Sequence, residues 1–115
     1  MARALKASVA GLLARLPGKA SAKWPQGERF ARAFAHGTMS VELYAPAGTD
    51  PQAPHTEDEI YVVTAGRATL WTPTHAVEMA AGDVAFVPAG EEHRFVDIVE
   101  DLAVKTALFA ELDGI

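Results

Sequence analysis

From Glu28 onward, short apolar runs are separated by turn residues at intervals of roughly eight to twelve positions, which is typical of an all-β domain. The turn signals include His36-Gly37, Ala65-Gly66 and Pro73-Thr74. We predict strands over residues 28–35, 38–45, 55–64, 67–72, 76–80, 84–87, 93–98 and 102–110. About eight strands in one domain favour a sandwich or a closed barrel, because both bury one face of every strand and leave few exposed edges.

The chain has 115 residues, of which 50% are hydrophobic, so it has the length of one domain and is too apolar to be disordered. We expect the side chains that fill the interior to be Tyr61, Val63, Val84, Phe86 and Phe95. Trp24 and Trp71 are expected in the core or in an interface, because aromatic side chains bury large areas.

The first 18 residues have a different periodicity. Their apolar residues are spaced as one stripe of an α-helix: Leu5, Val9, Leu12, Leu13 and Leu16. Pro17-Gly18 then ends the pattern. We therefore predict an amphipathic helix within residues 1–18, packed on the barrel or on a partner subunit, followed by a β-domain over residues 24–115.

Charge is divided unevenly along the chain. Residues 1–32 hold seven basic residues and one acid, a net charge of +6, so the other 83 residues carry −11 of the total of −5. An acidic body repels phosphates, so we expect no nucleic-acid partner. Arg15 and Lys19 interrupt the segment where a secretory signal would be apolar, so we expect a cytoplasmic protein. The short apolar stripe is needed for packing, so we expect no membrane binding.

The chain contains no cysteine, which excludes a disulfide scaffold, a thiolate zinc site and a cysteine nucleophile. A metal site would need nitrogen or oxygen ligands. Of the four histidines, His36 and His75 fall in predicted turns, where solvated side chains are common. His55 begins an acidic run that leads into a strand, and His93 follows a tight turn. These two are the candidates for chemistry.

One segment has a specific pattern of turn residues around His93. Gly82 is followed by five residues, Pro88, one residue, Gly90, two residues, His93, three residues and Asp97. This spacing resembles the second motif of the cupin superfamily, with aspartate at Asp97 where the family has asparagine. Glycines permit the turns, and proline fixes the approach of the strand that carries the histidine.

A second segment matches the first cupin motif in part. Glu59 and Gly66 have the required six residues between them, and this alignment places His55 at the motif's second histidine. Ala53 stands where the family has its first histidine, and the leading glycine is displaced by one position, to Gly48. The two motifs together cover residues 48–97.

The resemblance implies a metal site. Cupins with the full pattern hold a divalent ion with three histidines and one glutamate, so here the implied ligands are His55, Glu59 and His93. Two imidazoles and one carboxylate suit iron, zinc, manganese, nickel or copper, and they leave positions open for water and substrate. Gln52, one position before the alanine that replaces the first histidine, and Glu57, on the same face of a regular strand as Glu59, are candidates for an additional ligand.

The resemblance also implies a single cupin-type barrel, a double-stranded β-helix or jelly roll, with a short N-terminal α-helix. Such a barrel binds or acts on a small polar molecule, and dioxygenase and isomerase chemistry are both open. The alternative is a non-catalytic module, metal-loaded or metal-free, that binds or senses a small ligand. In the metal-free case the three residues form a hydrogen-bonded polar cluster. We also expect a homodimer, because the helix and the sheet edges leave apolar surface to cover.

Overall fold

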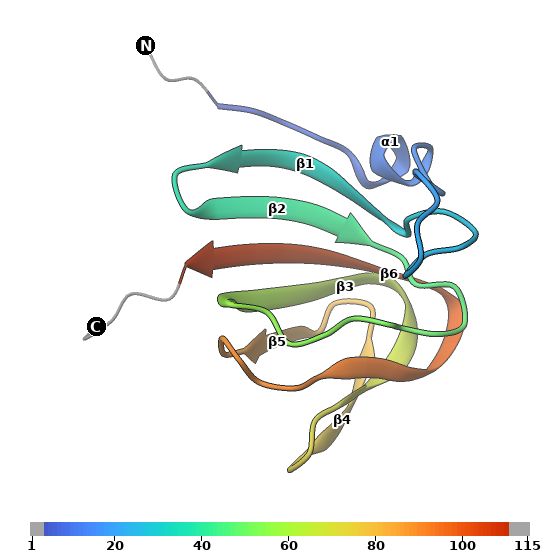
Figure 1. Ribbon diagram of the computed structural model, residues 1–115, viewed down its shortest axis with the longest axis vertical. Helices are drawn as coiled ribbons and strands as arrows, with labels where there is room; N and C mark the ends of the chain where they lie inside the picture. The colour runs from blue at the N-terminus through green and yellow to red at the C-terminus, as the bar shows by residue number, and fades with distance from the viewer. Residues whose placement is uncertain (1–3, 111–115) are drawn as a thin grey trace.

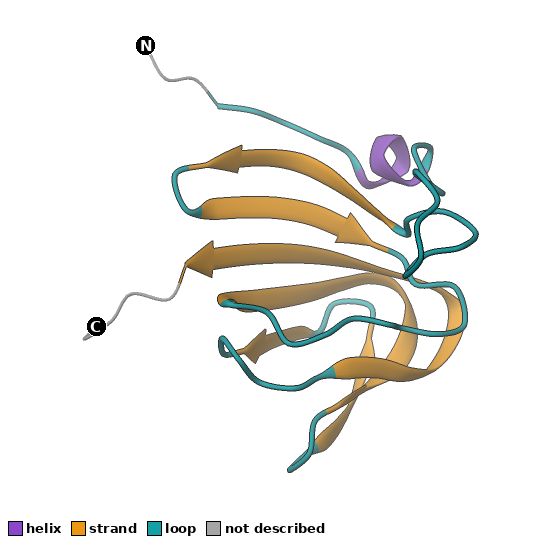
Figure 2. Cartoon of the chain, viewed as in Figure 1, coloured by secondary structure: helices purple, strands orange, loops and turns teal. Residues whose placement is uncertain are grey.

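The computed structural model describes residues 4–110; residues 1–3 and 111–115, which belong to the predicted helical region and β-domain, lie outside the described residues. The described chain contains one short helix and an antiparallel sheet (Figures 1 and 2). The elements are α1 (Val9–Leu13), β1 (Phe30–His36), β2 (Met39–Tyr44), β3 (Glu57–Trp71), β4 (Ala76–Ala80), β5 (Val84–Val87) and β6 (Arg94–Ala110). The predicted all-β class with a short N-terminal helix is confirmed.

The strands form one sheet in the order β1-β2-β6-β3-β4, and β5 pairs with β3. Every neighbouring pair is antiparallel. β3 and β6 are the longest strands and pair from Glu57 opposite Ala110 to Trp71 opposite Arg94. Both strands curve around the interior, so the sheet folds over on itself (Figure 1).

The predicted strands 55–64 and 67–72 are one continuous strand, β3, and 93–98 and 102–110 are likewise joined in β6. The turn signal at Ala65-Gly66 produces an irregularity in the β3–β6 register instead of a chain reversal. Gly66 has a φ of 72°, and a Cβ atom there would lie 2.6 Å from the carbonyl oxygen of Glu100. A glycine is therefore needed where β3 bends against β6.

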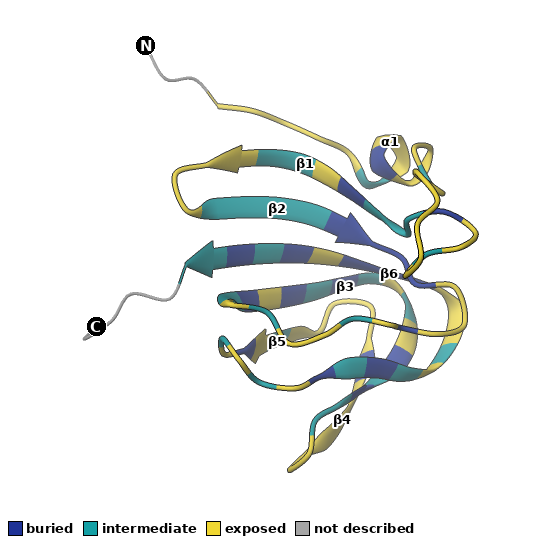
Figure 3. Cartoon of the chain, in the orientation of Figure 1, coloured by how far each residue is buried: buried dark blue, intermediate teal, exposed yellow. Residues whose placement is uncertain are grey.

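Three of the five predicted interior side chains are almost fully buried: Tyr61, Val63 and Phe95, each 1% exposed (Figure 3). The prediction is wrong for Val84 and Phe86, which are 65% and 62% exposed. Phe86 pairs with Ile60, which is also exposed, on the outer face of the sheet. Because side chains alternate along a strand, Val87 is the buried residue of β5.

The helix is shorter than the apolar stripe predicted. Ser8 caps α1 by accepting a hydrogen bond from the Gly11 amide at 3.0 Å, so the helix begins at Val9 and residues 4–8 are not helical. Leu12 is buried in a small cluster with Ala31 of β1 and Leu43 of β2, whereas Leu5 and Leu13 are exposed. Within residues 4–110, no helix is long and apolar enough to cross a membrane.

The two tryptophans have different surroundings. Trp24 is partly buried, and its ring meets the rings of Phe30 and Tyr44 edge to face, at centroid distances of 6.4 and 6.1 Å. Trp71 is half-buried beneath the guanidinium of Arg94, which lies 4.7 Å from the ring centroid. Trp24 thus belongs to an aromatic cluster with one residue of β1 and one of β2.

Candidate metal centre

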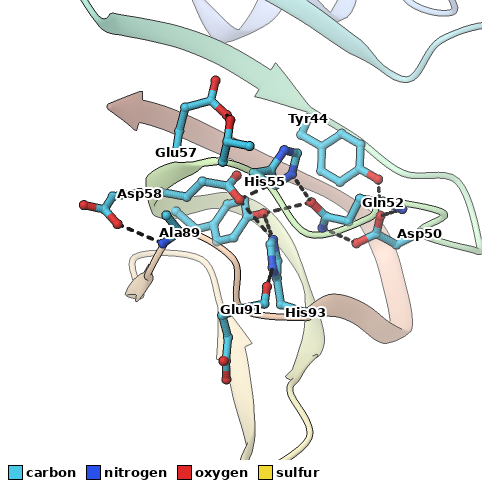
Figure 4. Close-up of polar contacts among 12 residues, drawn as sticks. Tyr44, Asp50, Gln52, His55, Glu57, Asp58, Ala89, Glu91 and His93 are labelled. Carbon is cyan, nitrogen blue, oxygen red and sulfur yellow. Dashed lines mark hydrogen bonds and ion pairs between the residues drawn. The ribbon is translucent and has the colours of Figure 1, made fainter. Parts of the chain in front are cut away.

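The structure brings His55, Glu59 and His93 together, as the two motifs predicted. His55 lies in the loop before β3, and His93 ends the turn between β5 and β6 (Figure 4). Glu59 lies on β3. One potential ligand atom from each residue lies within 4.8 Å of the other two. The remaining histidines are exposed to solvent: His36 is the last residue of β1, and His75 lies in the loop before β4.

Two turn glycines of the second motif hold this arrangement in place. Gly82 and Gly90 have φ angles of 96° and 81°, in the left-handed region that favours glycine. The Gly90 amide also donates a hydrogen bond of 2.7 Å to the carbonyl oxygen of His55. The turn that delivers His93 is thereby joined to the loop that carries His55. Asp97, at the motif's asparagine position, has a φ of 52°, which aspartate and asparagine tolerate better than most residues.

Glu59 is the centre of the group. Its side chain is 2% exposed, and its Oε1 atom lies 3.1 Å from Nε2 of His93 and 3.3 Å from Nε2 of His55. Despite these short distances, Oε1 is buried with no hydrogen bond of acceptable geometry. Ligand atoms about 2.0–2.1 Å from a tetrahedral zinc ion lie about 3.3–3.4 Å from one another. An orphaned carboxylate oxygen at that spacing from two imidazoles fits a divalent ion.

His93 is 1% exposed, and its Nδ1 lies 2.8 Å from the carbonyl oxygen of Glu91. Because a carbonyl only accepts, Nδ1 carries a proton, and Nε2 is the nitrogen that faces the group. Burial lowers the pKa of the imidazole, but the neighbouring Glu59 carboxylate and the Glu91 carbonyl raise it, and the net pKa is above the usual value. The second ring nitrogen of a metal-binding histidine is commonly fixed in this way.

Tyr61 and Gln52 complete the polar cluster. The Tyr61 hydroxyl donates to Oε1 of Gln52 at 3.0 Å and lies 2.9 Å from Nε2 of His93. Oε1 of Gln52 lies 3.1 Å from Nε2 of His55. Burial, followed by the charge of Glu59, raises the pKa of Tyr61, so the residue stays a neutral phenol.

Of the two candidates for an additional ligand, only Gln52 reaches the cluster. Oε1 of Glu57 instead accepts a hydrogen bond from the Thr56 hydroxyl at 3.1 Å, and Glu57 lies outside the group of mutually close ligand atoms. Sequence reasoning placed Tyr61 in the core and missed its hydroxyl. The available signal was its position two residues after Glu59, on the same strand face.

A cavity of about 430 Å³ opens onto the cluster. Its walls include the rings of Trp24 and Phe30 and the side chains of Arg32 and Thr106. The Thr106 hydroxyl is buried and has no hydrogen-bond partner in the structure. The cavity therefore combines aromatic surface and a cation beside the His-Glu-His group.

Comparisons with known proteins agree with this architecture. A family model described as "Cupin domain" matches residues 40–106. An uncharacterized protein of Streptomyces coelicolor is 50% identical over 68 residues, which is 57% of this chain and 65% of that protein, so the match covers less than two thirds of the relative.

Three solved structures resemble the fold. A protein of unknown function from Rhizobium leguminosarum has a TM-score of 0.73 at 15% identity, over 96% of this chain and 100% of its own. DMSP lyase DddQ from Ruegeria pomeroyi has a TM-score of 0.64 at 21% identity, over 97% of this chain and 58% of its own. A putative mannose-6-phosphate isomerase from Ralstonia eutropha has a TM-score of 0.61 at 20% identity, over 71% and 83%. At these identities the likeness shows the fold alone. The chain belongs to the cupin family, and its fold is a cupin barrel.

Proposed function

We propose that this cupin holds one divalent metal ion through His55, Glu59 and His93 and uses it on a small polar molecule that enters the adjoining cavity. The observation that carries the proposal is the buried Oε1 atom of Glu59, which has two imidazole nitrogens at 3.1 and 3.3 Å but no hydrogen bond. A buried carboxylate without a partner is costly, and a cation between these three atoms would remove that cost.

The donor set limits the chemistry. Two imidazoles and a carboxylate suit iron, zinc, manganese, nickel or copper, and three protein ligands leave positions open. When bound, such an ion supplies either a Lewis acid for an isomerisation or redox chemistry for an oxidation. The neutral Tyr61 hydroxyl holds a proton at the edge of the group, and the rings of Trp24 and Phe30 give the cavity an apolar wall.

Metal analysis of the untagged protein, before and after anaerobic loading with zinc, manganese, nickel or iron, tests the proposal. We expect about one ion per chain. Glu59→Gln should lose most of it, and Glu57→Gln should keep it, because Glu57 lies two residues away on the same strand but outside the ligand group. A wild-type protein that takes up no ion, or equal metal contents in the two variants, contradicts the proposal.

Screening the iron-loaded protein for oxygen uptake, and the zinc- or manganese-loaded protein for isomerisation of small hydroxylated or enolisable compounds, then separates the two reaction classes. Turnover that disappears in Glu59→Gln supports an enzyme. Tight binding of a compound without turnover supports a binding module instead.

A metal-free binding module is the second candidate, and one observation favours it. Gln52 and Tyr61 already share a hydrogen bond of 3.0 Å, and Nε2 of His93 lies 2.9 Å from the Tyr61 hydroxyl, so part of the cluster is satisfied without an ion. In that case, isothermal titration should detect small polar ligands in chelator-treated protein at the same affinity as in metal-loaded protein.

We also propose that the chain forms a homodimer. The exposed apolar side chains of Ile60, Val84 and Phe86 share the outer face where β5 pairs with β3. Sedimentation at micromolar concentration should give twice the mass of 12.2 kDa. Phe86→Ser should shift the protein towards the monomer, and a wild-type monomer would show the proposal to be wrong.

A further inference from the structure

The Gln52 side chain has only one orientation compatible with its neighbour Asp50, a buried residue in the loop between β2 and β3. One carboxylate oxygen of Asp50, Oδ2, accepts a hydrogen bond from Nε2 of Gln52 at 2.5 Å, and the other, Oδ1, accepts from the Gln52 backbone amide at 3.1 Å. An ionised carboxylate only accepts hydrogen bonds, so the amide nitrogen must face Asp50. The amide oxygen must then face the opposite way.

That opposite direction leads to His55, one of the ligands of the proposed metal site (Figure 4). Oε1 of Gln52 lies 3.1 Å from Nε2 of His55, a spacing that matches the 3.1 and 3.3 Å between Glu59 Oε1 and the two imidazoles. Oε1 also accepts from the Tyr61 hydroxyl. The amide oxygen is therefore placed beside His55, one of the three implied ligands, where it can serve as a fourth, neutral donor.

Asp50 is itself anchored to the barrel. Its side chain is buried, with 7% of the residue exposed, and it accepts hydrogen bonds from the Tyr44 hydroxyl and, at 2.8 Å, from the Phe95 backbone amide. Phe95 lies two residues after His93 on the same chain segment. Asp50 therefore links the loop that carries Gln52 to the strand that follows His93, and its hydrogen bonds offset the cost of burying a carboxylate.

We propose that Gln52 is the fourth protein ligand of the ion and that Asp50 is the positioning residue that keeps the Gln52 oxygen turned towards it. This inference rests on the proposed metal site. It assigns to Gln52, one residue before Ala53, the place that the first histidine fills in cupins with the full motif. The resulting set of two nitrogens and two oxygens is harder than three histidines and a glutamate, which shifts the preference of the site towards manganese and ferrous iron.

Cobalt titration of the metal-free full chain tests the inference, because the visible absorption of Co²⁺ reports the number and kind of its ligands. Gln52→Leu keeps the size of the side chain and removes the oxygen. We expect it to shift the Co²⁺ absorption bands and to weaken zinc binding, measured in competition with a chelator, by about tenfold or more. Gln26→Leu, at an exposed position, is the matched control and should change neither.

Asp50→Asn replaces one acceptor by a donor, so the Gln52 amide is no longer held in one orientation. We expect the Co²⁺ bands to shift in the same direction as in Gln52→Leu and zinc affinity to fall about 10–100-fold. Asp58→Asn is the matched control, because Asp58 also accepts a backbone hydrogen bond, from Ala89 at 2.8 Å, but does not contact Gln52. Its Co²⁺ spectrum should equal that of the wild type.

These experiments distinguish a failure of the proposed metal site from a failure of the role assigned to Gln52 or Asp50. If wild-type protein binds no cobalt or zinc, the metal site itself is wrong, and the inference fails with it. If the wild type binds cobalt and Gln52→Leu gives the same spectrum and affinity, Gln52 is not a ligand although the metal site stands. If Gln52→Leu shifts the spectrum but a folded Asp50→Asn does not, Asp50 has no positioning role. Circular dichroism identifies any variant that fails to fold, and Gln52→Leu tests the ligand independently of Asp50→Asn.

Discussion

The interior of the barrel has a polar half and an apolar half. The two are equally buried, but burial has opposite effects on the free energy of folding in them. Along β3, the inward positions change from Glu59 through Tyr61 to Val63, and along the neighbouring segment they change from His93 to Phe95. All five residues are 1–2% exposed. In the apolar half, burial stabilises the fold by about 25 cal/mol per Å² of apolar surface. In the polar half, burial costs free energy unless each polar atom has a partner.

Burial alone therefore does not show whether a residue contributes to stability or to binding. Tyr61 shows this within one side chain, because its ring packs on Phe95 at a centroid distance of 5.0 Å while its hydroxyl reaches His93 and Gln52. The apolar half is expected to determine stability, and the polar half to determine what the protein binds. Substitutions in the two halves should therefore have separable effects.

The largest effect is expected in the apolar half. Phe95→Ala removes a fully buried ring and should lower the free energy of unfolding by about 3–5 kcal/mol, measured by urea denaturation of the metal-free protein. The backbone amide that bonds to Asp50 is retained, so the folded fraction should still bind one ion. Loss of zinc binding by folded Phe95→Ala protein would show that the halves are not separable.

His93→Ala, two residues earlier, should have the opposite profile. It removes an implied ligand, so zinc affinity should fall by at least about a hundredfold, equivalent to about 2.7 kcal/mol. The free energy of unfolding of the metal-free protein should change by less than in Phe95→Ala. The reason is that Oε1 of the neighbouring Glu59 has no hydrogen bond even in the wild type. Chelator competition and urea denaturation on the same preparations measure both quantities; a stability loss equal to that of Phe95→Ala would contradict the comparison.

Tyr61→Phe tests the boundary between the halves. The ring contact with Phe95 is kept, and the two contacts of the hydroxyl are lost, so unfolding free energy should fall by only about 1–2 kcal/mol. Zinc affinity should fall by about tenfold, because Gln52 and His93 each lose a partner that orients them. An unchanged affinity would place Tyr61 entirely in the apolar half.

The smallest effect is expected for Ala53→His, which restores the first histidine of the family motif. Ala53 is exposed in the loop before β3, which begins at Glu57, so positions 53 and 55 do not share a strand face. Zinc retention should change within about threefold, as for other exposed substitutions. A rise of more than tenfold would show that this loop brings a histidine to the polar half.

The all-β class and the convergence of His55, Glu59 and His93 could be predicted because turn residues and motif spacing are local signals. The outward position of Phe86 could not, because all four residues of β5 are apolar and no alternation identifies its inner face. The bulge at Gly66 resembled a turn, since its partner strand lies more than 30 residues away in the sequence. Asp50 gave no signal for the same reason, because one of its partners is the amide of Phe95.

The distribution of the polar cluster along the chain has a consequence for how such a protein can diversify. Five of its residues lie within positions 50–61, which form one loop and the start of one strand: Asp50, Gln52, His55, Glu59 and Tyr61. Only His93 comes from elsewhere in the sequence. Most of the polar cluster therefore comes from one short stretch of the chain, so changes confined to this stretch would alter most of the side chains around the proposed ion.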